Sequence, residues 1–191
     1  MSKKKLNVLV IRGYYSKGNS LEYLNINNIE VKVTTVALGR PVLVKRKLQK
    51  IINKYKVCEH NRYDLIYAIS MSSCISSLVD EKVHKKLHLI TPFFLHYKTI
   101  SVLARFKIRK MLGAYLLLLL NGKLGDFHKD VRVTLAEKDK IVDNKFFACK
   151  WSNVNWIKGI DHHLPKEVFE DILVRDINNL INLNQLNLLS S

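Results

Sequence analysis

The sequence predicts a single α/β domain over residues 1–191, built on an open, mostly parallel sheet of six strands with helices on both faces. Apolar runs of strand length alternate with longer stretches whose apolar residues recur at helical spacing, which is typical of this class. No repeat or low-complexity linker interrupts the alternation. Of the 191 residues 48% are hydrophobic, which is enough for one core of good size but hardly for two.

Six segments have the composition of buried strands, rich in apolar and β-branched residues and bounded by polar residues, glycine or proline. The first ends at Gly13, and the fourth is stopped by Thr91-Pro92. In chain order, the predicted strands are residues 7–12, 30–36, 64–69, 87–90, 131–136 and 154–157. An open α/β sheet places its chemistry just beyond the carboxyl ends of its strands, so functional residues are expected there.

Helices are predicted between the strands and at the end of the chain. Residues 42–55 begin after a proline, and their apolar residues lie on one face with lysine and arginine mostly on the other. Residues 72–79 are predicted as a short helix, and residues 98–120 as one long helix or two. Residues 165–189 form a closing helix whose first turn is acidic, as the helix dipole favours.

The composition argues against several classes of protein. The longest nearly unbroken apolar run, residues 111–120, is about half of the ~20 residues that a membrane-spanning helix needs. The basic N-terminus leads directly into a strand too short and too β-branched for a signal sequence, so we expect a cytoplasmic protein. Cys58, Cys74 and Cys149 show neither disulfide nor metal-binding spacing. No metal and no cofactor is expected.

The turn after the third predicted strand is a candidate nucleophile site. Residues 69–74, ISMSSC, make a tight passage of small residues between a strand and a helix. The turn resembles the G-x-S-x-G nucleophile elbow, in which the residues two before and two after the nucleophile are small. We expect Ser72 to be the nucleophile, with Ser70 and Cys74 at the glycine positions. The alternatives are a helix N-cap without catalysis and Cys74 as the nucleophile.

Two later turns hold a candidate acid and a candidate base. Asp139 stands in the segment AEKDKIV, residues 136–142, just past the fifth predicted strand. His162 follows the last strand, three residues after Gly159. The alternative interpretations are a solvated loop carboxylate for Asp139 and a surface histidine pair for His162. If the segment does hold the base, His163 is the rival to His162.

Ser72, Asp139 and His162 follow one another in the order nucleophile, acid, base, each just beyond a strand. Because of this order, the chain resembles a compact serine esterase or thioesterase of the α/β-hydrolase superfamily. The resemblance extends from about Leu6 to the C-terminal helix. The sequence departs from the family at the elbow, which lacks both glycines, and at Arg12, where histidine is commoner.

The resemblance implies a site, a cap and a mechanism. Backbone N–H groups of Tyr14 and Ser73 would form the oxyanion hole. Residues 91–124 would form a small helical cap, whose leucines at 116–120 either hold a fatty chain or pack in the core. The histidine would take the serine proton as the hydroxyl attacks an ester or thioester carbonyl, while the aspartate fixes the imidazole tautomer.

The resemblance therefore leads us to expect a serine hydrolase that cleaves an acyl ester or thioester, a substrate that acyl carrier protein could present. The alternative is a catalytically inactive binding module with the same fold, whose basic surface binds an anionic partner. The missing elbow glycines and the high charge of the chain motivate this alternative.

The charge of the chain predicts an anionic partner. Lys+Arg 32 against Asp+Glu 16 gives a formal net charge of +16. Residues 31–58 hold eight lysines or arginines and no acid, and residues 82–125 hold nine and no acid. We expect, in this order, an acidic carrier protein, an anionic membrane surface and nucleic acid. Nucleic acid comes last because no recognition motif is present and aromatic residues are sparse among the basic ones.

Overall fold

The computed structural model describes residues 5–14, 18–40, 42–59, 61–95, 108–142 and 144–189, which form an α/β fold as predicted. Its single sheet has seven strands in the order β2-β3-β1-β4-β5-β6-β7. All neighbouring strands are parallel except β2 and β3, which confirms a mostly parallel sheet. The strands are β1 (Lys5–Tyr14), β2 (Ser20–Ile26), β3 (Ile29–Gly39), β4 (Leu65–Ile69), β5 (Leu87–Ile90), β6 (Arg132–Ala136) and β7 (Val154–Ile157).

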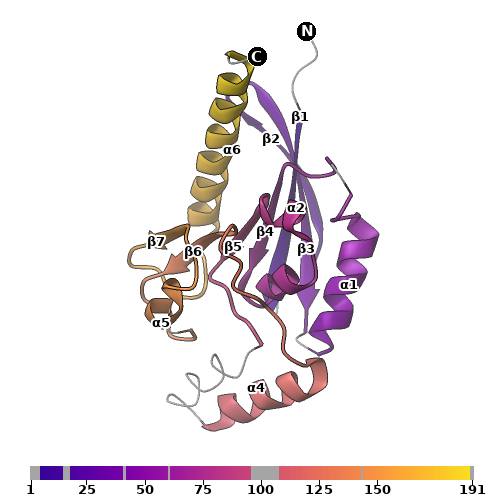
Figure 1. Cartoon of the computed structure of the whole chain (residues 1–191), viewed down its shortest axis with the longest axis vertical. Helices are drawn as coiled ribbons and strands as arrows, with labels where there is room; N and C mark the ends of the chain where they lie inside the picture. Colours follow the sequence, from indigo (N-terminus) through magenta and orange to yellow (C-terminus); the bar gives the residue numbers. More distant parts are fainter. Residues whose placement is uncertain are drawn as a thin grey trace.

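Helices cover both faces of the sheet (Figure 1). The helices are α1 (Val44–Tyr55), the 3₁₀ helix η1 (Ser70–Ser77), α2 (Glu81–His84), α4 (Ile108–Asn121), α5 (Asn144–Ala148) and α6 (Lys166–Leu189). Leu9 and Ile11 of β1 pack with α1 and η1, whereas Val8 and Val10 pack with α6. Successive residues of β1 therefore enter two different cores, which is why this strand is apolar almost throughout.

The sheet has one strand more than the sequence predicts. The additional strand, β2, lies at the edge of the sheet, pairs antiparallel with β3 and is mostly exposed. Asn27 and Asn28 join the two strands with positive φ angles of 49° and 64°, as a two-residue hairpin turn of the primed type requires. This asparagine pair is the sequence signal for the hairpin, and the prediction of six strands is wrong.

The other predicted elements are present with shifted ends. The six predicted strands and the first and last helices begin and end within a few residues of their expected bounds. The helix expected at residues 72–79 starts at Ser70, a difference that changes the candidate site. For the helix expected at residues 98–120, α4 provides the second part, and residues 98–107 lie outside the described residues. The short helices α2 and α5 were not expected from the sequence.

The strand order reverses at β1. From β1 the chain forms β3 on one side, and it then crosses to form β4 on the other side. Loops that leave neighbouring strands in opposite directions open a crevice beyond their carboxyl ends, where α/β proteins bind their ligands. Because β1 ends at Tyr14 and β4 at Ile69, the end of β1 and Ser70, which follows β4, stand at the crevice.

Helix α4 lies at the end of the molecule toward which the parallel strands run (Figure 1). After α4 the chain returns to the core, where the Leu124 N–H donates to the Leu95 carbonyl at 2.9 Å. At the end of α4, the Asn121 Oδ1 accepts from the backbone N–H of Lys45 at 3.2 Å, so α4 touches the start of α1. A cap over residues 91–124 stays a prediction, since residues 96–107 lie outside the described residues.

The leucines of α4 point in different directions. Leu118 is buried and belongs to the same core cluster as residues of α1 and η1, whereas Leu116, Leu119 and Leu120 are exposed. The expectation that this run packs in the core therefore holds for Leu118 and in part for Leu117, which packs half-buried against the core, and not for the other three. Among the helices that the structure describes, none has both the length and the apolar composition to cross a membrane.

Candidate active site

Three side chains from three separate turns form a hydrogen-bonded line at the carboxyl end of the sheet. Ser70 Oγ lies 2.7 Å from His162 Nε2, and His162 Nδ1 lies 2.8 Å from Asp139 Oδ2. The serine follows β4, the aspartate follows β6 and the histidine follows β7. The histidine and aspartate side chains are only 6% and 1% exposed, whereas the serine is half-buried. The serine is therefore the member of the line that solvent or substrate can reach.

Ser70 stands on a sharp turn between β4 and η1. Its φ of 57° lies in the left-handed region, which is costly for a residue with a side chain and is found at functional sites. The Ser70 carbonyl accepts from the Phe93 N–H at 3.1 Å, which fixes the turn from one side. Ala68 and Ser72, the residues two before and two after, are small and buried. The turn thus has the geometry of a nucleophile elbow centred on Ser70.

Gly13, near the end of β1, lets that strand pass against the turn. A Cβ on Gly13 would lie 2.5 Å from the Ile69 carbonyl oxygen and 2.9 Å from the Ser70 Cβ. Both distances are shorter than real atoms tolerate, so the position requires glycine. This close approach brings the last peptide of β1, at Tyr14, beside the turn that carries Ser70.

Ser72, the nucleophile predicted from the sequence, does not lie against the histidine. It is fully buried, and its Oγ lies 2.6 Å from the Ile11 carbonyl oxygen and 2.9 Å from that of Ile69. The hydroxyl therefore ties η1 to β1 and β4 and is closed off from solvent. The prediction that Ser72 meets the histidine is therefore wrong, and the candidate nucleophile is Ser70, which begins η1 directly after the end of β4.

The candidate oxyanion donors change with the nucleophile. In a nucleophile elbow the residue after the nucleophile supplies one N–H, so with Ser70 this residue is Met71 and not Ser73. Ser73 is fully buried inside η1, and its hydroxyl donates to the Ala68 carbonyl at 3.1 Å. The predicted role of its backbone N–H depended on Ser72 as the nucleophile, so Met71 replaces Ser73 as the candidate donor. The predicted role of Tyr14 fits its place at the end of β1 and stays a prediction.

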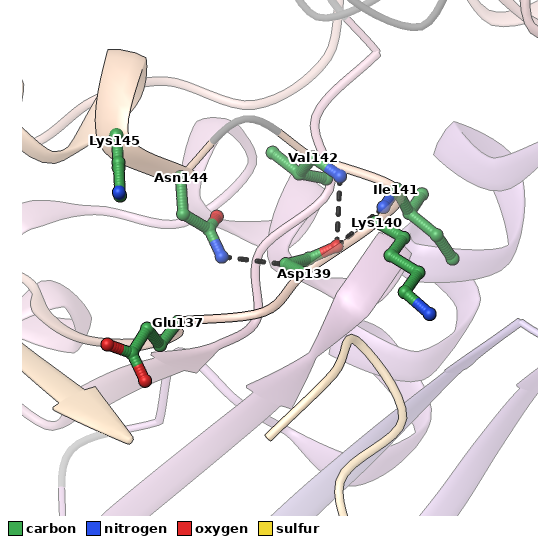
Figure 2. Close-up of a pocket in the computed structure, with 7 residues that line it drawn as sticks. All are labelled: Glu137, Asp139, Lys140, Ile141, Val142, Asn144 and Lys145. Carbon is green, nitrogen blue, oxygen red and sulfur yellow. Dashed lines mark hydrogen bonds between the residues drawn. The ribbon is translucent and has the colours of Figure 1, made fainter. Parts of the chain in front are cut away.

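Asp139 is held by its own loop. Its Oδ1 accepts from the backbone N–H groups of Ile141 and Val142 at 2.8 and 2.9 Å, and its Oδ2 accepts from the Asn144 Nδ2 at 3.3 Å (Figure 2). Asn144 also donates to the Ala136 carbonyl at 2.8 Å, which anchors this arrangement to β6. Oδ1 is thus used by the loop, and Oδ2 is directed at the histidine. Asn144 is a supporting residue that the sequence interpretation did not identify.

The loops after β6 and β7 are paired, which is why the acid and the base meet. The Glu137 N–H donates to the Ile157 carbonyl, and the Lys138 N–H donates to the Ile160 carbonyl, both at 3.0 Å. Gly159 turns between them with a φ of 73°, and its N–H donates to the Glu137 Oε2 at 3.0 Å. The two strand ends are thereby extended side by side as far as the candidate site.

Asp161 joins the same two loops. Its Oδ1 accepts from the backbone N–H of its neighbour His162 and from that of Lys140, the latter at 3.3 Å. The hydrogen bond from the His162 N–H, followed by that from Lys140, lowers the pKa of this partly exposed carboxyl below its ordinary value. Asp161 thus fixes the backbone of His162, while Asp139 contacts its ring.

The rival residues do not occupy the site. Cys74 is fully buried, and its thiol lies 3.5 Å from the Phe93 carbonyl oxygen. Burial raises the pKa of this thiol to about 12, although backbone hydrogen bonds oppose the rise, so it is protonated at neutral pH. His163 is exposed, and its ring centroid lies 6.1 Å from that of His162. The described residues therefore favour Ser70 over Cys74 and His162 over His163.

The line of side chains is suited to nucleophilic chemistry. An ionised carboxylate only accepts hydrogen bonds, so in its contact with Asp139 the His162 Nδ1 carries a proton, and Nε2 is left to accept from the Ser70 hydroxyl. This is the proton arrangement that a general base needs. In the part of the chain that the structure describes, no group of three or more His, Cys, Asp or Glu side chains could hold a metal ion.

Comparisons with known proteins add little to this geometry. No protein-family model matches the sequence, and no curated protein matches it significantly. One solved structure, described as "The structure of DcsB complex with its substrate analogue", is similar in fold with 8% sequence identity and a TM-score of 0.49. The similarity covers 96% of this chain and 92% of that chain. At this level the likeness says nothing of what this protein binds or catalyses.

Proposed function

We propose that the protein is a serine hydrolase of the α/β-hydrolase type that cleaves a carboxylic ester or thioester of an acyl chain. The observation that carries the proposal is the 2.7 Å contact of Ser70 Oγ with His162 Nε2. The strained φ of Ser70, the Asp139 contact behind the histidine and the position at the strand-order reversal support it. The chain order serine, aspartate, histidine is also that of the α/β-hydrolases.

The proposed reaction uses these groups in two steps. His162 Nε2 takes the Ser70 proton as Oγ attacks the carbonyl carbon, and the oxyanion accepts from the N–H groups of Met71 and Tyr14. The imidazolium then gives the proton to the leaving alcohol or thiol, which leaves an acyl group on the serine. Water, deprotonated by the same nitrogen, attacks the carbonyl of this ester, and the bond to Ser70 Oγ then breaks as Oγ takes the proton back from the imidazolium and the acid is released. Asp139 holds the tautomer and stabilises the imidazolium in both steps.

Intact-mass analysis after labelling with a fluorophosphonate tests the proposal without a guess at the substrate. Wild type and the variant Ser72→Ala are expected to gain one adduct, and Ser70→Ala none. Ser72→Ala is the matched control, because it removes a buried hydroxyl of the same helix that does not touch the histidine. Circular dichroism on each variant shows whether the fold is retained.

Two results would contradict the assignment. Labelling that persists in Ser70→Ala would place the activated serine elsewhere. A folded wild-type protein that takes no label would instead favour the catalytically inactive binding module. If Ser70 is labelled as expected, the next measurement is hydrolysis of p-nitrophenyl esters of increasing chain length, compared with matching thioesters. It would define the acyl group and the leaving group.

A further inference from the structure

Helix α4 and the start of α1 together form an exposed apolar face. We call it the α4–α1 face. It consists of Tyr115, Leu116, Leu119 and Leu120 on α4 with Val42 and Leu43 before α1. Their exposed fractions run from 42% at Leu43 to 72% at Leu119. Scattered exposed apolar residues are ordinary, but a cluster of this kind marks an interaction site.

Helix α4 presents this face because it is docked by its other side. Leu118 is 4% exposed and belongs to the core, and the Asn121 side chain is bonded to the Lys45 N–H and the Leu117 carbonyl. The four outward residues repeat at intervals of three and four, which places them together on the opposite side of the helix. A helix on a protein surface ordinarily has polar residues there. The outward face of α4 is therefore apolar without covering any core.

The start of α1 continues the same surface. The contact of Asn121 with Lys45 brings the end of α4 against the first turn of α1, where Val42 and Leu43 are 50% and 42% exposed. Leu43 has a φ of 55°, in the left-handed region that branched side chains avoid. A strained leucine that stays exposed gains nothing from the fold itself, which suggests that its partner is external.

The surroundings of the α4–α1 face are basic. Lys45, Arg46 and Lys50 on α1 and Lys123 after α4 are all exposed. The two segments that supply the face, residues 31–58 and 82–125, contain no aspartate or glutamate. An apolar patch bordered by lysine and arginine is complementary to the surface of an anionic bilayer, where leucines enter the acyl region and cations remain at the headgroups.

The charge also decides between the possible occupants. A second copy of this chain, docked through the same face, would bring two basic borders together, and like charges oppose such a contact. The carboxylates of an acidic protein would pair with the lysines, but a partner recognised by charge alone does not account for the exposed leucines. We propose that the α4–α1 face binds the surface of an anionic lipid membrane. The proposal does not depend on the hydrolase activity of the Ser70 site.

Co-sedimentation with lipid vesicles tests the proposal. Wild-type protein is expected to bind vesicles of phosphatidylcholine mixed with phosphatidylserine, to bind phosphatidylcholine alone more weakly, and to be released as salt screens the charges. The double variant Leu119→Ser, Leu120→Ser should weaken binding by at least about tenfold, given the apolar area that two leucines bury. Lys45→Glu with Arg46→Glu should weaken binding to the anionic vesicles and leave the weak binding to neutral ones.

Matched controls come from the rest of the molecule. Leu183→Ser replaces a leucine that is 59% exposed on α6, and Lys129→Glu reverses an exposed lysine in the loop that leads into β6. Both variants should bind as wild type does. Equal vesicle binding by wild type and the leucine variant would overturn the proposal. A second result would also overturn it: the wild-type protein binds no vesicles, and sedimentation velocity shows a dimer that Leu119→Ser dissociates. The occupant of the α4–α1 face would then be a second copy of the chain.

Discussion

Gly13 and Ser70, near the ends of two neighbouring parallel strands, stand so close that no side chain fits between them. A Cβ on Gly13 would come within 2.9 Å of the Ser70 Cβ and 2.5 Å of the Ile69 carbonyl oxygen. The glycine therefore fixes how near β1 lies to the turn that carries the candidate nucleophile.

Replacing this glycine should damage the site more than the fold. In Gly13→Ala the added methyl must displace the turn, at a cost of about 1–3 kcal/mol in the free energy of unfolding, and the shift of Ser70 should slow ester hydrolysis by about 100-fold. Urea unfolding and p-nitrophenyl ester kinetics measure the two effects. Gly18→Ala is the control, because its Cβ meets nothing within 4 Å, and only its positive φ is strained. Unchanged hydrolysis in Gly13→Ala would contradict the role given to this approach.

The substitution Asp139→Asn should separate the two functions of the aspartate. The amide oxygen can still accept from the Ile141 and Val142 N–H groups, so the loop should keep its shape. The amide N–H₂ would face the His162 Nδ1 and favour the wrong tautomer, which should slow ester hydrolysis by about 10³–10⁴-fold, as in serine proteases. Asp171→Asn, at an exposed carboxylate of α6, is the control. A loss of less than tenfold would argue against the aspartate as the partner of the base.

The candidate acid and base that the structure brings into contact are the two residues that the sequence predicts, because each comes shortly after a strand that the apolar pattern locates. Asp139 lies in the loop just beyond the buried strand β6, and His162 follows Gly159, whose positive φ of 73° turns the chain there. Their contact depends on the pairing of the β6 and β7 loops, which the parallel sheet imposes.

The nucleophile could not be fixed in the same way. Serines at positions 70, 72 and 73 fall in one short turn, and small residues surround more than one of them. The choice depends on the residue at which β4 ends and η1 begins, and such boundaries are the least certain part of a sequence interpretation. The edge strand β2 could not be predicted for a different reason: most of its residues are exposed, and its sequence contributes little to the apolar pattern from which strands are predicted.

Alkylation of the cysteines should distinguish the buried thiol from the exposed ones. Cys58 and Cys149 are exposed, whereas Cys74 is fully buried with its pKa raised by burial to about 12. Iodoacetamide should therefore add two groups to the native protein and three to the protein in guanidinium chloride, as read by intact mass. Rapid native modification that peptide mapping assigns to Cys74 would show that η1 is open to solvent, and it would restore Cys74 as a rival nucleophile.

A second histidine and aspartate pair is buried away from the candidate site, between the sheet and α6. His88 Nδ1 lies 2.6 Å from Asp176 Oδ2, and His88 Nε2 lies 2.8 Å from the Thr134 Oγ1. The Tyr67 hydroxyl donates to the same Asp176 oxygen at 3.0 Å, and Arg132 lies 3.6 Å from it. These groups come from β4, β5 and β6, and they bind α6 to the sheet through the buried carboxylate of Asp176. All of them except Arg132 are almost fully buried.

Two pKa directions describe the charges in this cluster. Burial lowers the pKa of His88 below its ordinary value and outweighs the Asp176 contact, which acts in the opposite direction. For Asp176, burial raises the pKa, but the hydrogen bond and charge of His88, with smaller contributions from Arg132 and Tyr67, leave it below its ordinary value. A neutral His88 that donates from Nδ1 to an ionised Asp176 is consistent with both.

The cluster should make the protein sensitive to acid. The unfolded chain binds a proton at His88 near pH 6.5 while the folded protein resists it, so the stability that this residue contributes is present above pH 6.5 and falls as the pH drops below it. Asp176, also lowered, adds a further loss below about pH 3.8. The variant His88→Gln keeps an amide that can donate to Asp176 but has no group that titrates in this range. Its unfolding free energy should be lower than that of wild type at neutral pH, and this difference should shrink by up to about 1.4 kcal/mol per pH unit as the pH is lowered from 6.5 to 5. Urea titrations at several pH values measure this difference directly. A deficit that stays constant over this range would mean that His88 titrates alike in the folded and unfolded chain, and that the acid sensitivity has another origin.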